Sequence, residues 1–355
     1  MVVEAASGRR TFELDLTLLG GFRFGCRPDC GLCCFASPRL EGDDEARLRR
    51  AVPALRAVER QGARCIPARP EGGACELLEG LRCSAHAARP APCREFPVFV
   101  HVGTRWQAGL VLSCPGLSLD TLRGFGSVPR EPAFYGLDPE VAAVRERLTP
   151  KGSRLLEEAG RRRRRVVREL SAQGRWMEED EVRERLFREP LVPSPDEYAP
   201  TELPDIGAGL EQLPMYFDGR PGPMALAQAG EAWECVELSP GGGSTSEGLT
   251  VPPEEPPLLD ASARELLAGY LRYFLARDIF LAAVHWEMVR GEPGTVDDVT
   301  LTQLHAIGSD VLARAAVRSQ RRGKSGARLT ALDIELGIRA TDQDWLDRPS
   351  WGGRL

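Results

Sequence analysis

Cysteine spacing constrains this chain more than any other feature, because nine of its ten cysteines lie between residues 26 and 114 and all of these except Cys65 are clustered at ligand spacing. The first four form a CxxxCxxCC motif, which is short enough for one loop to surround a metal centre. Cysteines that serve only as small buried hydrophobic residues have no reason to cluster in this way. Thiolates bind zinc, copper(I) and iron–sulfur clusters in preference to hard cations. We therefore predict a metal site with these ligands: Cys26, Cys30, Cys33, Cys34, Cys75, Cys83, Cys93 and Cys114.

The adjacent pair Cys33 and Cys34 bears on the number of metal centres. Two neighbouring side chains do not easily reach one small ion, which indicates either two centres or one thiol that is not a ligand. Eight cysteines suffice for two closed zinc sites, and a four-iron cluster takes four cysteines. We favour an iron–sulfur cluster (4Fe–4S) over zinc, and both stay open. Five arginines could offset the negative charge of the thiolates: Arg23, Arg27, Arg82, Arg89 and Arg94.

Two cysteines and three histidines have less clear roles. Cys65 and Cys235 have no partner at ligand spacing, so we predict ordinary buried side chains there. His86 lies between two of the clustered cysteines and is the histidine best placed to contact the metal. His285 lies in an apolar stretch and is predicted to be a hydrogen-bonded core residue. His101 alternates with valines and is predicted to lie at the surface.

A hairpin is predicted from residues 96–102 and 105–112, with a turn at Gly103–Thr104. A two-residue turn there pairs residues whose numbers sum to 207, which places Cys93 opposite Cys114. Opposed residues of an antiparallel ladder lie about 4.5–5.5 Å apart at their Cα atoms. The hairpin is therefore predicted to bring these two thiols into one site.

Length and charge exclude several classes of protein. At 355 residues the chain can hold two compact domains, and its formal net charge of −6 argues against coating nucleic acid or an anionic membrane. The best candidate apolar stretch, residues 266–289, is interrupted by Arg272, Arg277 and Asp278 and is not a membrane span. The apolar run at residues 16–22 is too short for an export signal. We predict a cytoplasmic protein with reduced thiols, no nucleic-acid or membrane partner, and an unidentified protein partner or substrate.

The pattern of elements predicts an α+β fold: a cysteine-rich, metal-organised N-terminal module with a small antiparallel hairpin, followed by a mainly helical C-terminal domain. Proline and glycine between residues 190 and 260 indicate a connecting segment without regular structure. The predicted divisions are residues 1–130 for the cysteine-cluster domain, 131–189 for a charged helical segment, 190–260 for the connection and 261–355 for the helical domain.

Local signals predict individual elements. Alternation of apolar and polar residues predicts a strand over residues 11–18. Apolar periodicity predicts helices from Asp43 or Asp44 to about residue 60 with a kink at Pro53, over residues 141–187, and over residues 298–320 with an end near Gly323. A capping box of Ser262 and Glu265 precedes a further helix. The arginine run at residues 161–165 lies among glutamates and is typical of a solvated helix face.

The cysteine motifs resemble the YkgJ-type CxxCxxCC family, whose members are described as zinc- or iron-chelating. The resemblance covers about residues 20–120 and rests on the CxxxCGxCC motif from Cys26, the RPxxCRxFP element of residues 89–97 and the CPG of residues 114–116. It implies metal binding by the clustered cysteines. His86 departs from the family pattern, which usually has an aromatic residue there.

The sequence leaves the biochemical role open between a binding module and an enzyme. The favoured function is metal binding that supports a redox or modification reaction, and a purely structural zinc module is an alternative. Cys26, Cys30 and Cys33 match the CxxxCxxC spacing of radical S-adenosylmethionine enzymes, although the chain lacks the strand–helix alternation of a barrel. The cysteine cluster and residues 270–278 also resemble flagellin lysine N-methylases, which use S-adenosylmethionine. The chain has no phosphate loop, GxSxG or HExxH motif.

Overall fold

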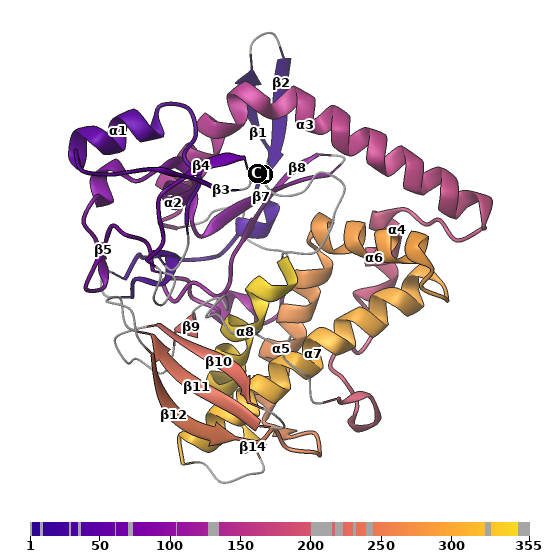
Figure 1. Ribbon diagram of the computed structural model, residues 1–355. Coiled ribbons are helices and arrows are strands. Elements are labelled where there is room, and N and C mark those ends of the chain that lie inside the picture. Colours follow the sequence, from indigo (N-terminus) through magenta and orange to yellow (C-terminus); the bar gives the residue numbers. More distant parts are fainter. Residues whose placement is uncertain are drawn as a thin grey trace.

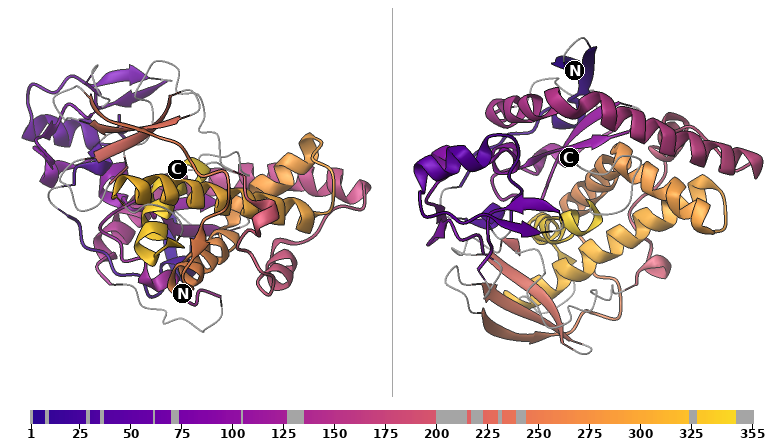
Figure 2. Two further views of the ribbon diagram at one scale, coloured as in Figure 1. Left: turned by 90° about the horizontal axis from the view of Figure 1, so that it is seen from below. Right: turned by 45° about the horizontal axis from the view of Figure 1, so that its top comes forward.

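The computed structural model describes residues 2–346 except 8–9, 28–29, 35–36, 61, 70–73, 104, 127–134, 200–214, 217–222, 230–231, 239–243 and 324–327. Its cysteine-bearing N-terminal part lies beside a group of C-terminal helices, and the long helix α3 runs along both (Figures 1 and 2). This arrangement confirms the predicted α+β class, in which small antiparallel sheets precede a helical C-terminal part.

A four-stranded sheet supports the N-terminal part, with strand order β1-β2-β8-β7. Strand β2 runs parallel to β8, and the other two pairs are antiparallel. The predicted strand over residues 11–18 is shorter than expected, because Asp15 accepts hydrogen bonds from the backbone N–H and the hydroxyl of Thr17 and starts a turn. The strands are β1 (Val2–Ser7), β2 (Arg10–Asp15), β7 (Val98–Val102) and β8 (Trp106–Leu110).

Between β2 and β7 the chain leaves this sheet and forms the cysteine-rich region, residues 23–97. Its elements are short, and its two small hairpins pair β3 with β4 and β5 with β6. The elements are η1 (Thr17–Leu19) just before the region, then η2 (Leu32–Cys34), α1 (Asp44–Ala51), β3 (Val58–Arg60), β4 (Ala63–Cys65), β5 (Leu78–Glu79), β6 (Arg82–Cys83), η3 (His86–Ala88) and α2 (Ala91–Glu95).

Helices form most of the rest of the described chain. Helix α3 contacts α2, β1, β7 and α6, so it joins the cysteine-rich region to the C-terminal helices. Helices α5 and α7 both pack against α8 (Figure 1). The elements are η4 (Asp120–Leu122), α3 (Asp138–Ala172), α4 (Glu179–Leu186), η5 (Pro195–Glu197), α5 (Ala261–Leu275), α6 (Asp278–Arg290), α7 (Val296–Arg321) and α8 (Ala331–Leu346).

A second four-stranded antiparallel sheet corrects the prediction for residues 190–260. We expected a connection without regular structure, and the chain instead pairs four strands in the order β12-β11-β10-β9. Apolar and polar residues do not alternate regularly along these strands, so the strand pattern is weak beside the prolines and glycines of the segment. The strands are β9 (Met215–Tyr216), β10 (Pro223–Ala229), β11 (Ala232–Leu238) and β12 (Ser244–Thr250), and the short strands β13 (Leu258–Leu259) and β14 (Arg328–Leu329) pair separately.

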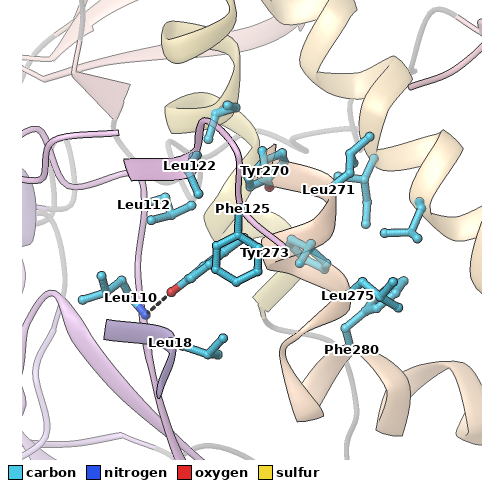
Figure 3. Close-up of a cluster of buried hydrophobic side chains, with 14 of the residues drawn as sticks. Leu18, Leu110, Leu112, Leu122, Phe125, Tyr270, Leu271, Tyr273, Leu275 and Phe280 are labelled. Carbon is cyan, nitrogen blue, oxygen red and sulfur yellow. Dashed lines mark hydrogen bonds between the residues drawn. The ribbon is translucent and has the colours of Figure 1, made fainter. Parts of the chain in front are cut away.

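One apolar core extends without interruption from β2 to α8. At its centre the Leu110 backbone N–H donates to the Tyr273 hydroxyl at 3.1 Å (Figure 3). The rings of Phe22 and Phe125 meet the Tyr273 ring edge to face, with centroids 5.5 and 5.2 Å away. The N-terminal sheet and the C-terminal helices therefore share a core, and the predicted domain boundaries at residues 130 and 261 do not separate two cores.

Two predicted helix ends need adjustment and a third is confirmed. Helix α1 ends at Ala51, so Pro53 terminates it where we expected a kink. Helix α5 begins after Asp260, whose carboxylate accepts from the Ala263 N–H at 2.7 Å, so Asp260 replaces the predicted Ser262 cap. The predicted helix over residues 298–320 is confirmed as α7, and Gly323 follows its end with a φ of 72°.

The histidine predictions have mixed outcomes. His101 is fully buried, which contradicts the predicted surface position, because both faces of β7 are covered. His285 is confirmed as a core residue: its Nε2 lies 3.2 Å from the Met177 carbonyl oxygen and its ring stacks on Trp176.

The arginine run of residues 161–165 is mostly exposed, as predicted. Among the described residues, no helix has the length and apolar character needed to cross a membrane.

Candidate metal centre

Seven of the eight predicted ligands line one cavity of about 340 Å³. They come from separate elements of the cysteine-rich region, which folds around this space. Exposed residues, among them Arg82 and His86, also line the cavity, so it reaches the surface. The seven are Cys26, Cys30, Cys33, Cys34, Cys75, Cys83 and Cys93.

The first four cysteines lie on the predicted wrapping loop, which closes into the short turn η2. The Cys34 N–H donates to the Gly31 carbonyl at 2.9 Å. Gly31 has a φ of 57°, a conformation that side chains with a Cβ rarely adopt. The turn aims successive residues in different directions, which places Cys30 in the interior and leaves Cys26 exposed.

Backbone hydrogen bonds and the pairing of β5 with β6 bring Cys34, Cys75 and Cys83 together. The Cys75 N–H donates to the Cys34 carbonyl at 2.6 Å. Cys83 lies on β6, opposite Leu78 of β5, and the Leu78 N–H donates back to the Cys75 carbonyl at 2.9 Å. All three cysteines pack in one small apolar cluster with Leu48.

The predicted pairing of Cys93 with Cys114 is wrong. Strands β7 and β8 pair residues whose numbers sum to 208, as in Val98 with Leu110, because the Gly103 N–H closes a longer turn on the Arg105 carbonyl at 2.9 Å. The second predicted turn residue, Thr104, lies outside the described residues. The ladder ends at Val98, and Cys93 is in helix α2 and not on a strand.

Cys114 is held beside the beginning of the cysteine loop instead. Residues 23–25 run antiparallel to residues 116–118, with Phe24 opposite Leu117. The Gly25 N–H donates to the Gly116 carbonyl at 2.9 Å, and a Cβ on Gly116 would lie 2.6 Å from the Gly25 carbonyl oxygen. This close backbone contact places Cys26 next to the segment of Cys114, which is buried in the main core and is not among the residues that line the cavity.

Helix α8 holds the segment that carries Cys114. The buried guanidinium of Arg339 donates to the backbone carbonyls of Leu112, Cys114 and Leu117. It also forms an ion pair with Glu335 at 2.6 Å. Local sequence patterns carry no signal for this contact, because Arg339 is more than 220 residues from the carbonyl groups it binds.

Part of the chain matches a known protein family. Residues 25–110 match the CxxCxxCC family. Its printed description is “Putative zinc- or iron-chelating domain”. No curated protein and no solved structure matches the chain. Seven of the eight predicted ligands thus lie in the segment that matches this family model, and Cys114 and Arg339 lie outside it.

Some thiols in the matching segment form hydrogen bonds with one another. A hydrogen bond from the Cys34 thiol lowers the pKa of Cys83 to about 6, against the opposing effect of burial. The same thiol also lowers the pKa of Cys33, and the two hydrogen bonds raise the pKa of Cys34. The Cys34 thiol is therefore within hydrogen-bonding reach of both Cys33 and Cys83.

Burial keeps the other thiols protonated. It raises the pKa of Cys75 to about 11 and the pKa values of Cys93 and Cys114 well above their ordinary range. Metal binding requires the thiolate, so a metal ion would displace these protons when it binds.

Of the five predicted arginines, Arg89 is the one that acts on several thiols. After the larger effect of the Cys34 hydrogen bond, its charge lowers the pKa of Cys33 and Cys83. Its guanidinium also donates to the Cys93 carbonyl at 3.4 Å. Arg27 and Arg82 line the cavity, whereas Arg94 forms an ion pair with Glu146 and Arg23 lies over the Tyr135 ring.

The remaining candidates divide clearly. His86 lines the cavity, and burial lowers its pKa, so its ring is neutral and able to bind a metal. Cys65 is buried and is not among the residues that line the cavity, as predicted for an isolated cysteine. The side chain of Cys235 lies outside the described part of the structure. Glu140 at the start of α3 is a residue that sequence reasoning missed: burial and the charge of Cys33 raise the pKa of Cys26, and the charge of Glu140 adds a smaller increase.

The donor set fits a thiophilic metal. Seven sulfurs and one neutral imidazole border a single space, and soft ligands of this kind suit zinc and iron. Among the described residues, no three Cys, His, Asp or Glu side chains already have the geometry of a bound ion. The Cys34 thiol lies within hydrogen-bonding reach of Cys33 and of Cys83.

Proposed function

We propose that the cysteine-lined cavity holds an iron–sulfur centre through thiolates, and that this centre organises the cysteine-rich region. The observation that carries the proposal is the convergence of seven cysteines, from both ends of the CxxCxxCC domain, on one cavity. Buried cysteines without a ligand would be dispersed through a core, as Cys65 is.

The size of the cavity favours a polynuclear centre over a single zinc ion. Four sulfur atoms close tightly around a zinc ion at about 2.3 Å each. The cavity that these cysteines line together with apolar side chains has a volume of about 340 Å³. An iron–sulfur cluster also accumulates negative charge from its thiolates. The charge of Arg89 is placed to offset it, as are the cavity-lining Arg27 and Arg82.

The access of solvent to the cavity is compatible with a redox or modification role. Exposed Cys26 and His86 border the opening, so a small molecule can reach the centre. A bound iron–sulfur cluster would supply one-electron chemistry there. The chain's own contribution is to hold the sulfurs, to keep apolar side chains such as Leu48 and Ile66 around them and to set the charge through Arg89. Such a centre requires reduced thiols, which supports a cytoplasmic location.

Anaerobic purification followed by iron, sulfide and zinc analysis and visible absorption tests this proposal. We expect iron and sulfide together with a broad visible absorption that bleaches on reduction. Cys83→Ser should lower the metal content, and the matched control Cys65→Ser should retain it because Cys65 does not line the cavity. A colourless protein with stoichiometric zinc would overturn the iron–sulfur assignment, and a wild-type chain that takes up no metal would overturn the proposal entirely.

A further inference from the structure

A second cavity lies where the β7–β8 turn meets α3, α4 and α6. Its volume is about 300 Å³, which is at the lower end of the range for small-molecule sites. Among the described residues that line it, seven of eight are charged, and the eighth is Gly103. No described residue lines both this cavity and the cysteine-lined one, so a ligand can occupy it whether or not the metal centre is filled.

A buried ion pair forms the inner end of this cavity. Arg183 of α4 donates to Asp278 of α6 at 2.5 Å, and each residue is only 8% exposed. The Nε of Arg183 also donates to the Leu275 carbonyl at 3.3 Å. The Asp278 backbone N–H donates to the side-chain oxygen of Gln107 on β8 at 2.7 Å. These contacts tie both elements of the ion pair to the core, so the two charges are in place before a ligand arrives.

Burial decreases from this ion pair towards the opening of the cavity. Arg163 and Glu179 are half-buried, whereas Arg105, Glu178 and Asp180 are exposed. The cavity therefore has a largely desolvated inner end, where electrostatic interactions are strong, and an outer end that a small solute can enter.

Two of the three guanidinium groups keep N–H donors that no described residue accepts. The hydrogen bond of Arg105 to Asp278, at 3.3 Å, uses Nε and leaves both Nη atoms without an acceptor among the described residues. Arg163 donates to Glu178 and Glu179 from Nε and Nη2, which leaves Nη1 in the same position within the described part of the chain. Guanidinium N–H groups of this kind bind carboxylates with good geometry.

Carboxylates outnumber guanidinium groups on the cavity walls. The described lining residues carry four carboxylates and three guanidinium groups, which is an excess of one negative charge. Asp180 accepts from Arg183 through one oxygen at 2.7 Å, and its side chain remains 88% exposed, so its other oxygen is accessible at the opening. The excess of negative charge favours a ligand that carries net positive charge.

We propose that this cavity binds a small zwitterion with a net charge of +1, namely a free basic amino acid. The carboxylate of the ligand binds the remaining N–H groups of Arg105 and Arg163, and its ammonium group binds Asp180 and Glu178 at the opening. A simple anion would meet the excess of carboxylates, and a simple cation would leave the guanidinium donors unfilled. Only a ligand with both signs of charge uses both sets of groups.

Calorimetric titration of the wild-type chain with three related probes tests this charge pattern. L-Arginine should bind. L-Arginine methyl ester lacks the carboxylate and Nα-acetyl-L-arginine lacks the α-ammonium group, so each should bind about 10–100-fold more weakly, because each loses charge-assisted hydrogen bonds. No binding of L-arginine at millimolar concentration, or equal binding of L-arginine and either derivative, would overturn the proposal.

Glu178→Gln tests the end of the cavity that binds the ammonium group. It removes a charge from the lining and should weaken the binding of L-arginine about 10-fold. Glu184→Gln is the matched control, because Glu184 pairs with Arg188 at 4.0 Å on the exposed side of α4 and is not among the residues that line the cavity. The control should bind L-arginine as the wild-type chain does. Equal losses in the two variants would overturn the assignment.

Arg105→Gln tests the end that binds the carboxylate. The preference for L-arginine over its methyl ester should be about 10-fold smaller in this variant, because the group that distinguishes the two probes has lost a partner. An unchanged preference would overturn the role of Arg105. Circular dichroism establishes that each variant is folded, and the comparison of the three probes on the wild-type chain decides the proposal if a variant does not fold.

Discussion

The cysteine-rich region and the C-terminal helices differ in how much apolar surface they bury. The cysteine-rich region has short elements and a small apolar cluster built from residues such as Leu48, Leu55 and Ile66. The C-terminal helices bury long apolar faces in a core that reaches as far as β2 and includes Tyr270 and Phe274. A region with so little apolar burial needs another source of stability, and metal binding is the one that its cysteines offer.

A buried ion pair ties the C-terminal helices to the end of β8, which leads on to Cys114. Arg277 of α6's N-terminal cap donates to Asp342 of α8 at 2.8 Å and to the Leu110 carbonyl at 2.8 Å. Asp342 in turn accepts from the Leu112 N–H at 2.7 Å. This ion pair fixes the end of β8, from which the chain runs directly to Cys114. The comparison therefore predicts that metal removal unfolds the cysteine-rich region, whereas loss of this ion pair destabilises the core that the helices share with β8.

Metal removal should have the largest effect and should separate the two regions. Structural zinc contributes about 10–16 kcal/mol in small domains, so chelation should unfold most of residues 30–95 while α5–α8 remain folded. Hydrogen exchange followed by mass spectrometry would show fast exchange confined to the cysteine-rich region. Exchange that increases equally in both regions, or in neither, would contradict the division of stability described above.

Asp342→Ala should have the next largest effect, on the buried ion pair that ties α6 and α8 to the chain after β8. It leaves the Arg277 charge buried without its carboxylate, which typically costs about 3–5 kcal/mol. Urea unfolding followed by circular dichroism would measure the loss. The double variant Arg277→Met, Asp342→Leu removes both charges and should recover most of the stability. A double variant as unstable as the single one would show that packing, and not the unpaired charge, dominates at this position.

Acid should weaken the shared core through His101. Burial lowers the pKa of this histidine to about 3, while in the unfolded chain it is near 6.5. Below pH 6.5 the unfolded chain binds a proton that the folded chain does not, so stability falls as the pH decreases from 6.5 towards 3. At pH 5 the loss is about 2 kcal/mol. His101→Gln should have a flatter dependence between pH 7 and pH 5 in urea unfolding; parallel curves would exclude His101 as the cause.

The local patterns predicted several elements well and one segment poorly. Capping and apolar periodicity located α7 and the start of the C-terminal helices closely. The sheet of β9–β12 was missed, because its strands alternate weakly and lie between proline- and glycine-rich stretches. His101 was misplaced for a related reason: alternation shows that a strand has two faces but does not show that both are covered.

The sequence by itself determined that clustered cysteines dominate the N-terminal third, and seven of the eight predicted ligands line one cavity. Only the tertiary structure decided which cysteines are neighbours. A turn one residue longer than predicted shifted the β7–β8 register, and helix α2 took Cys93 away from the ladder. The segment that carries Cys114 lies instead beside the start of the cysteine loop, held by backbone pairing across some 90 residues and by Arg339 of α8. Residue spacing sets the chemistry of a cluster, but contacts between distant segments set its geometry, because they depend on the packing of the whole chain.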